Sequence, residues 1–96
     1  MRNYLELSDL FHEPSLEERL LNIAARIRRV RRRKKLSQAE LADRSFVSLG
    51  SIRRFEQTGQ ISFESLYRIA ISLGCGNELD QLFSVVPLTY EEIENA

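Results

Sequence analysis

The sequence predicts an all-α domain of five helices with a short extension at each end. Apolar residues recur three or four positions apart in successive stretches of the chain, which is the spacing of a buried helix face. Several of these stretches begin just after a serine, a residue type that often accepts the first free backbone N–H groups of a helix. The 96 residues are enough for one small domain with a modest core.

The first helix is expected from residue 15 to about residue 34. Ser15 follows Pro14 and has Glu18 three positions later, which is the pattern of a capping box. The side chains expected on the buried face are Leu16, Leu20, Ile23, Ala24, Ile27 and Val30.

Residues 36–59 predict two short helices joined by a tight turn. Ser37 can cap the first of them and Ser48 the second. The side chains expected to point inward are Leu41 and Ala42 in the first helix and Ile52 and Phe55 in the second.

The second of these two helices has a polar, basic outward face. Because successive helix residues are about 100° apart, Gly50 and Arg54 lie nearly opposite the inward Ile52. Ser51 and Arg53 lie on the flanks. Such a face suits a DNA groove.

Two further helices and a tail complete the prediction. Ser62 opens a fourth helix that Gly74 closes, and Asn77 can cap a short fifth one. Pro87 excludes a central strand, so residues 84–87 are expected to be extended. Residues 90–96 are expected to form an acidic tail, with a frayed helix as the alternative. The apolar side chains assigned to the two helices are Leu66, Ile69, Ala70 and Leu73, then Leu79, Leu82 and Phe83.

The charge of the chain is segregated, although its formal net value is zero. Residues 1–18 carry a net charge of −4, residues 19–54 carry +10, with twelve Lys or Arg against two acids, and residues 55–96 carry −6. Binding to DNA depends on the charge of the contacting face rather than on the total. The middle of the chain is therefore the candidate DNA surface, and the acidic ends are expected to lie away from it.

Ten residues of the central stretch resemble the helix-turn-helix of the Cro/C1 repressor (XRE) family: Leu36, Ser37, Gln38, Leu41, Ala42, Val47, Ser48, Ile52, Glu56 and Gly59. The likeness extends less sharply over residues 23–83 and implies a five-helix Cro/C1 repressor-like domain. Phe46 departs from the pattern, because the family usually has glycine there. A left-handed backbone is costly for a bulky side chain, so the turn can be reshaped and the angle between the two helices is left open.

The resulting organisation is an N-terminal extension over residues 1–14, a helix-turn-helix domain over residues 15–83 and an acidic tail over residues 84–96.

Arg31 falls on the apolar side of the first helix, and Glu56 falls about 40° from Ile52 on the inner side of the third. We expect them to form a buried, charge-assisted pair rather than a DNA contact. The resemblance implies the same pairing.

The resemblance implies that Gln38 bonds a DNA phosphate and braces the base-reading side chains, and a helix N-terminus favours such an anion. Arg53 and Arg54 are assigned to guanine readout or phosphate clamping, with simple solvation as the alternative. Gly50 costs about 1 kcal/mol against alanine in a helix, so it is assigned to close approach of the duplex, with a tolerated surface glycine as the alternative. The remaining expected contacts are Ser48 with phosphate, Leu49 with a thymine methyl group, Ser51 with a base edge, and Thr58 and Gly59 with phosphate in the loop after the helix.

The basic run that ends the first helix has two readings. Arg33, Lys34 and Lys35, which are nearest the motif, are assigned to phosphate contacts. The earlier arginines, Arg28, Arg29 and Arg32, can meet phosphate or equally an acidic protein. A solvated helix face is the alternative for the whole run.

Nothing in the sequence favours an enzyme, a metal or a cofactor. His12 and Cys75 lack an orienting partner nearby in the sequence, and metal-ligand spacing and a phosphate-binding glycine loop are absent. A single cysteine cannot form an intramolecular disulfide, and no apolar run has the length of a membrane span or signal-peptide core. A reducing cytoplasm is therefore expected.

The expected function is sequence-specific repression through a palindromic DNA operator, bound as a homodimer. The fifth helix and residues 82–86 are the candidate dimer interface.

Residues 48–66 resemble HipB-like antitoxins, which implies repression of the protein's own operon and binding to a HipA-type kinase toxin. The alternative is a protein-interaction module that does not bind DNA. The candidate partner-binding element is an apolar and acidic segment within residues 1–14, with a disordered arm or packing on the domain's own core as the alternatives: Tyr4, Leu5, Leu7, Leu10 and Phe11.

Overall fold

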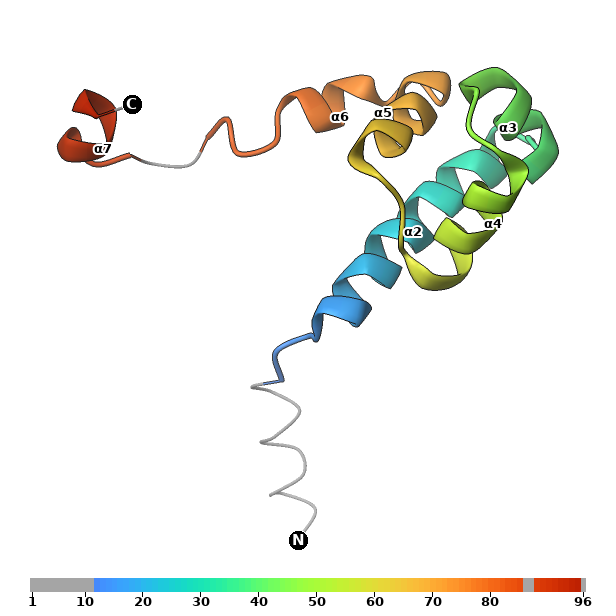
Figure 1. The fold of residues 1–96 in the computed structure, drawn as a ribbon, viewed down its shortest axis with the longest axis horizontal. Coiled ribbons are helices and arrows are strands. Elements are labelled where there is room, and N and C mark those ends of the chain that lie inside the picture. Colours follow the sequence, from blue (N-terminus) through green and yellow to red (C-terminus); the bar gives the residue numbers. More distant parts are fainter. Residues whose placement is uncertain (1–11, 86–87, 96) are drawn as a thin grey trace, which may run out of the picture.

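The computed structural model describes residues 12–85 and 88–95, and Figure 1 shows its helices. They are α2 (Leu16–Arg33), α3 (Gln38–Ser45), α4 (Leu49–Thr58), α5 (Phe63–Ser72), α6 (Gly76–Asp80) and α7 (Tyr90–Glu94). No strand occurs in these residues, so the predicted all-α class is confirmed. The predicted count of five helices is not confirmed, because residues of the tail form a sixth one, α7. The candidate partner-binding segment and the end of the extended piece fall on residues 1–11 and 86–87, outside the described residues.

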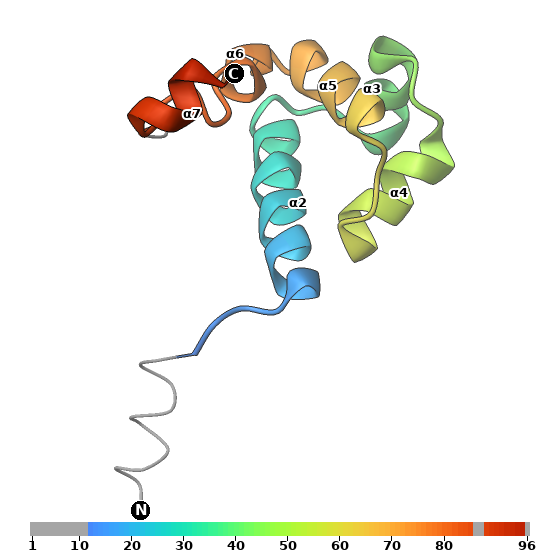
Figure 2. The ribbon, with the colours of Figure 1, turned by 60° about the vertical axis from the view of Figure 1, so that its left-hand side comes forward.

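The core lies where α2, α3, α4 and α5 meet. Helix α2 packs along α4, helix α3 packs against both α4 and α5, and α6 packs on α5 (Figure 2). The buried cluster contains one small residue of α2, Ala24, which allows the helices to approach closely. The other buried members are Leu36, Leu41, Val47, Ile52, Phe55, Ile69 and Leu73.

Four serines cap helices as predicted. Ser15, Ser37, Ser48 and Ser62 each accept a hydrogen bond from the backbone N–H three residues later. The capping box predicted at Ser15 is incomplete, because the Glu18 carboxylate bonds His12 Nε2 at 3.3 Å instead. Ser37 has the complete box: the Glu40 side chain accepts from the Ser37 N–H at 2.8 Å.

The helix ends depend on left-handed residues, and two of those between the core helices are not glycine. Gly74, with φ 76°, closes α5 through bonds from its own N–H to Ile71 and from the Cys75 N–H to Ala70. Lys35, with φ 59°, ends α2 in the same way. Phe46 adopts φ 60° and ψ 27° between α3 and α4 with its ring 85% exposed, so the turn keeps the left-handed geometry despite the bulky side chain.

Three details of the predicted packing are wrong. Leu16 and Ile23 are 66% and 44% exposed, because none of the helices in residues 12–85 and 88–95 covers that side of α2. Asn77 is not the cap of α6, which begins one residue earlier, after Cys75 and without a side-chain cap. Leu82 and Phe83 follow α6 in a turn rather than forming part of it, and both are exposed.

Gly59 joins the end of α4 to α2 by backbone contact. It adopts φ 80°, and a Cβ atom placed on it would lie 2.6 Å from the backbone carbonyl carbon and the Cβ atom of Leu20. Gly50 differs, because a Cβ atom there would have no neighbour within 4 Å. A side chain therefore has no room at Gly59, the C-cap of α4, whereas it has open space at Gly50 within α4.

We expect Gly59→Ala to lower the free energy of unfolding by more than about 2 kcal/mol, because the methyl group meets a left-handed backbone and the Leu20 backbone together. Gly50→Ala is the control and should raise it by up to about 1 kcal/mol, since alanine favours an open helix position. Urea unfolding of both variants measures the difference. Equal effects would contradict the packing of Gly59 on α2.

Candidate nucleic-acid interface

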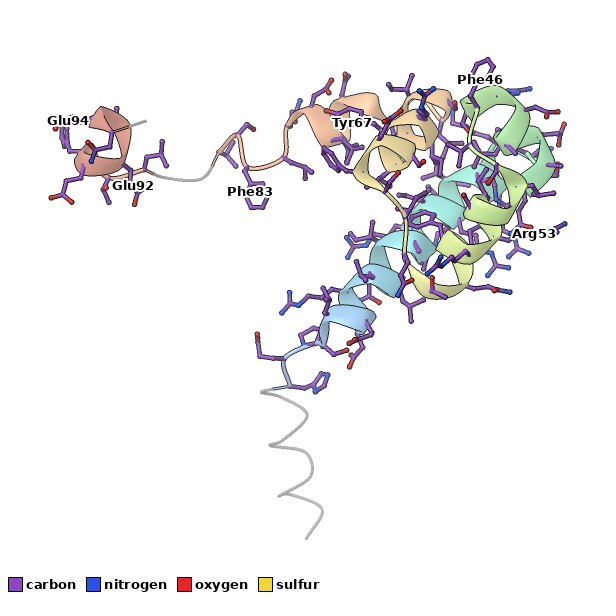
Figure 3. The ribbon with its side chains drawn as sticks, viewed as in Figure 1. Phe46, Arg53, Tyr67, Phe83, Glu92 and Glu94 are labelled. Atoms are coloured by element: carbon purple, nitrogen blue, oxygen red, sulfur yellow. The ribbon has the colours of Figure 1, made fainter. Side chains whose placement is uncertain are left out.

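The outward face of α4 is exposed and basic. Ile52 and Phe55 are buried, while Gly50, Arg53 and Arg54 are exposed on the other sides of the helix. Figure 3 shows the Arg53 side chain extending away from the body of the protein. The helix therefore presents two guanidinium groups on either side of an unobstructed backbone.

The N-terminal turn of α4 carries two linked hydroxyl groups. Ser48 Oγ donates to Ser51 Oγ at 2.8 Å and accepts the Ser51 backbone N–H at 3.1 Å. Leu49 is half-buried and lines an open hollow of about 610 Å³ with Phe46 and Val47. The predicted contact residues of this turn thus lie together at the start of the helix.

Arg54 lies beside a polar hollow that the sequence interpretation did not identify. Its Nη2 donates to Gln60 Oε1 at 2.6 Å. The hollow has a volume of about 320 Å³ and is lined by Ser51, Arg54, Gln60, Ile61, Ser62 and Ser65. The sequence does show two of its hydroxyl groups, on the cap Ser62 and on Ser65 three residues later. It does not show that they lie near Arg54, because that depends on how α4 and α5 pack.

Thr58 and Gly59 do not form the open loop that the sequence predicted. Thr58 is the last residue of α4, and its hydroxyl donates to the Arg54 carbonyl at 2.7 Å and accepts the Gln60 N–H at 3.1 Å. The Gly59 N–H donates to the Phe55 carbonyl at 2.7 Å, and Gly59 is buried. The backbone N–H of Gly59 is therefore used within the helix terminus and does not face a phosphate.

Arg31 and Glu56 form a bidentate ion pair between α2 and α4. Arg31 Nε donates to Glu56 Oε2 at 2.8 Å and Nη2 donates to Oε1 at 3.0 Å. The two side chains are 8% and 6% exposed. The remaining Nη1 donates to the Leu36 carbonyl at 2.7 Å, so each nitrogen of the guanidinium group has a partner.

Two more side chains converge on the same carboxylate. Gln38 Nε2, at the first turn of α3, donates to Glu56 Oε1 at 2.9 Å, and Arg28 Nε lies 3.7 Å from that oxygen. Burial raises the pKa of Glu56, but the hydrogen bonds from Arg31 and Gln38 and the charges of Arg31 and Arg28 outweigh it, and the net pKa is lowered. The carboxylate therefore adds stability above its ordinary pKa of 4.5 that is lost as the pH falls through the lowered value.

The end of α2 leads into a turn that approaches the end of α5. Arg33 is the last residue of α2, and Lys34 and Lys35 form the turn after it. The Lys34 ammonium lies 4.0 Å from the Cβ position of Gly74, at the C-terminus of α5, where a cation is favoured by the helix dipole. Arg28, which the sequence left open between phosphate, an acidic protein and solvent, lies with Arg31 beside the Glu56 carboxylate that Gln38 also contacts.

Comparison with known proteins assigns this arrangement to a family. A family model described as Helix-turn-helix matches residues 27–76, which is just over half of the chain. The chain belongs to the Cro/C1-type (XRE) helix-turn-helix family. No curated protein and no solved structure gives a significant match to the helix-turn-helix protein.

Family membership indicates a DNA-binding transcription regulator. The matched residues run from the middle of α2 to the first residue of α6, so they include the outward face of α4, Gln38 and the Arg31–Glu56 pair. Within residues 12–85 and 88–95, no group of three or more metal-ligand side chains comes together. None of the helices in those residues has the length and apolar character needed to cross a membrane.

We expect Arg31→Met and Glu56→Met each to destabilise the helix-turn-helix protein by roughly 3–5 kcal/mol, because each leaves a buried charge unpaired. The double variant should lose much less than the two single losses combined. Chemical unfolding of the four proteins gives the coupling energy. Additive losses would show that the two side chains do not act as a pair.

Proposed function

We propose that the chain is a cytoplasmic, sequence-specific transcriptional repressor that inserts α4 into the major groove of DNA. The observation that carries this proposal is the outward face of α4, where Arg53 and Arg54 stand on either side of Gly50. Arginine can donate two hydrogen bonds to the O6 and N7 atoms of guanine. A glycine between the two side chains lets the backbone approach the base pairs closely.

The side chains around α4 fit a division between base contacts and phosphate contacts. Gln38 lies at the N-terminus of α3, where free N–H groups and the helix dipole favour a phosphate, and its bond to Glu56 orients it. Arg28 is half-exposed beside Gln38 and can meet the same strand. We also assign Leu49 to a thymine methyl group, Ser48 and Ser51 to the start of the groove contact, and Arg33, Lys34 and Lys35 to flanking phosphates.

The hollow beside Arg54 is our candidate for a second phosphate position. The Ser62 and Ser65 hydroxyl groups and the N-terminus of α5 meet the Arg54 guanidinium around it. Since Arg54 bonds Gln60 in the free protein, DNA would compete with Gln60 for this guanidinium group. The Thr58 hydroxyl already donates to the Arg54 carbonyl and accepts the Gln60 N–H. We therefore assign Thr58 a contact with DNA only through the remaining exposed part of its side chain.

A homodimer would double the contacts on a palindromic operator. The exposed apolar residues after α6 support this assignment, because Phe83 is 84% and Val85 89% exposed. Sedimentation velocity of Phe83→Glu measures it: a monomer is expected, and an unchanged dimer would place the interface elsewhere.

The antitoxin role rests on the resemblance of residues 48–66 to HipB-like proteins. In that role the chain would repress its own operon and bind a HipA-type kinase toxin. Co-purification of the chain with such a kinase expressed from the same operon tests it. An operon without a kinase gene, or a kinase that elutes alone, would leave a repressor without a toxin partner.

We expect wild-type protein to bind its own promoter DNA with sequence preference and strong salt dependence in a fluorescence-anisotropy titration. Arg53→Ala/Arg54→Ala should weaken binding by at least about tenfold and reduce the salt slope by up to about two, because each arginine meets a base edge or a phosphate. Gly50→Ala should weaken binding while the fold stays intact.

Arg68→Ala is the matched control, since Arg68 is exposed on α5 and pairs with Glu64 at 3.0 Å. Its affinity for the promoter should not change. Absence of sequence-preferring binding by wild type would instead support a protein-interaction module, with the basic face of α4 as its docking surface.

A further inference from the structure

Helix α2 carries a second basic surface besides the one near α4. Arg19, Arg26, Arg29 and Arg33 are three to seven positions apart, so they form one row, roughly 21 Å long at 1.5 Å per residue. All four are exposed. Within the part of the chain that the structure describes, Arg19 approaches Glu13 at 3.5 Å and the other three have no acidic partner. Like charges at these spacings destabilise a helix unless an anion lies over them.

This arginine row faces away from the proposed DNA surface. Arg28 and Arg31 lie on the flank of α2 that contacts Glu56 of α4. At about 100° per residue, the centre of the row is turned by about half a turn from those two residues. A duplex seated on α4 therefore leaves Arg19, Arg26 and Arg29 uncovered, because only Arg33, at the end of the row, is assigned to a flanking phosphate. A different anionic partner is needed to explain the other three.

The row has an apolar edge. Leu16 and Ile23 are 66% and 44% exposed and lie about 60° and about 40° from Arg19 around the helix. A surface of arginines beside exposed aliphatic side chains is complementary to an amphipathic helix whose apolar stripe is bordered by carboxylates.

The C-terminal segment of this same chain has that chemistry. No Lys or Arg follows Arg68, and α7 carries Glu91, Glu92 and Glu94. Tyr90 and Ile93, which are 85% and 57% exposed, fall on one side of α7, with Glu94 next to them and Glu91 and Glu92 farther round the helix. A five-residue helix is too short to be stable alone, so α7 needs a surface to dock on.

The segment is directed away from its own α2. A turn after α6, closed by the Ser84 N–H and hydroxyl on the Gln81 carbonyl, places Phe83 at φ 62°. Figure 1 shows α7 apart from helices α2–α5, and the turned view in Figure 2 also keeps it clear of α2. In Figure 3 the Glu92 and Glu94 side chains lie far from the body of the protein. Among residues 12–85 and 88–95 of one copy, nothing therefore covers the segment or the arginine row.

We propose that α7 of a second copy docks on the outer face of α2, between the arginine row and the apolar edge. Two-fold symmetry makes the contact reciprocal, so each copy gives its C-terminal helix to the other. The contact adds to the one proposed for the exposed apolar residues after α6, and it rests on the proposed function for the dimer alone. It leaves both α4 helices free for DNA.

A charge-swap experiment tests the contact without DNA. One variant carries Arg26→Glu/Arg29→Glu on α2, and the other carries Glu92→Lys/Glu94→Lys on α7. Each alone should weaken dimerisation in sedimentation velocity at low salt by at least about tenfold, because like charges then face each other. An equimolar mixture of the two should dimerise again, since both reciprocal contacts become attractive. Glu17→Lys/Glu78→Lys changes the net charge as much as the α7 variant and should leave the dimer unchanged.

Each other outcome overturns the proposal. A monomeric wild type excludes the second copy, and unaffected dimerisation of the two variants places the interface elsewhere. Loss without recovery on mixing indicates that α7 binds the α2 of its own chain. Circular dichroism confirms that each variant is folded, and the promoter titration is read separately, so a protein that dimerises but does not bind DNA fails only the proposed function.

Discussion

The carboxylate of Glu56 is the point on which the arrangement of the three helices depends. It accepts hydrogen bonds from Arg31 of α2 and Gln38 of α3, while Arg31 also holds the carbonyl of Leu36 between those helices. Burial makes an unpaired charge expensive, so the four groups have to stay together once the core has formed around them. The same contacts fix Gln38 at the edge of the DNA surface. Packing and the orientation of a candidate DNA contact are thus provided by one network.

The fold was predictable wherever it is encoded locally. Ser15, Ser37, Ser48 and Ser62 cap helices because a hydroxyl three residues ahead of a free N–H needs no distant partner. Predictions failed where the result depends on tertiary packing or on weak local preferences. Leu16 and Ile23 have helical spacing but no neighbouring helix covers them, and Asn77 is passed over because α6 already begins after Cys75. Residue type alone does not contain that information.

The candidate site divides in the same way. The outward placement of Gly50, Arg53 and Arg54 follows from helix geometry once Ile52 and Phe55 are assigned to the core. The hollow beside Arg54 and the nearness of Arg28 to Glu56 depend on how α4 meets α5 and α2, so neither was visible in the sequence. Thr58 and Gly59 were assigned to a loop because α4 was expected to end earlier. Phe46 keeps the left-handed turn with a bulky residue: its N–H donates to the Ala42 carbonyl and its side chain stays exposed.

The contact of Gly59 with the Leu20 backbone has a consequence for how such a protein can evolve. Any side chain at residue 59 would push α4 away from α2, so residue 59 has to remain glycine. As long as it does, the direction of the α4 axis relative to α2 is kept. Gly50 has no such restriction, because a side chain there would extend into solvent. New operator preferences can therefore arise by changing residues on the outward face, one at a time, while the scaffold that aims them stays the same.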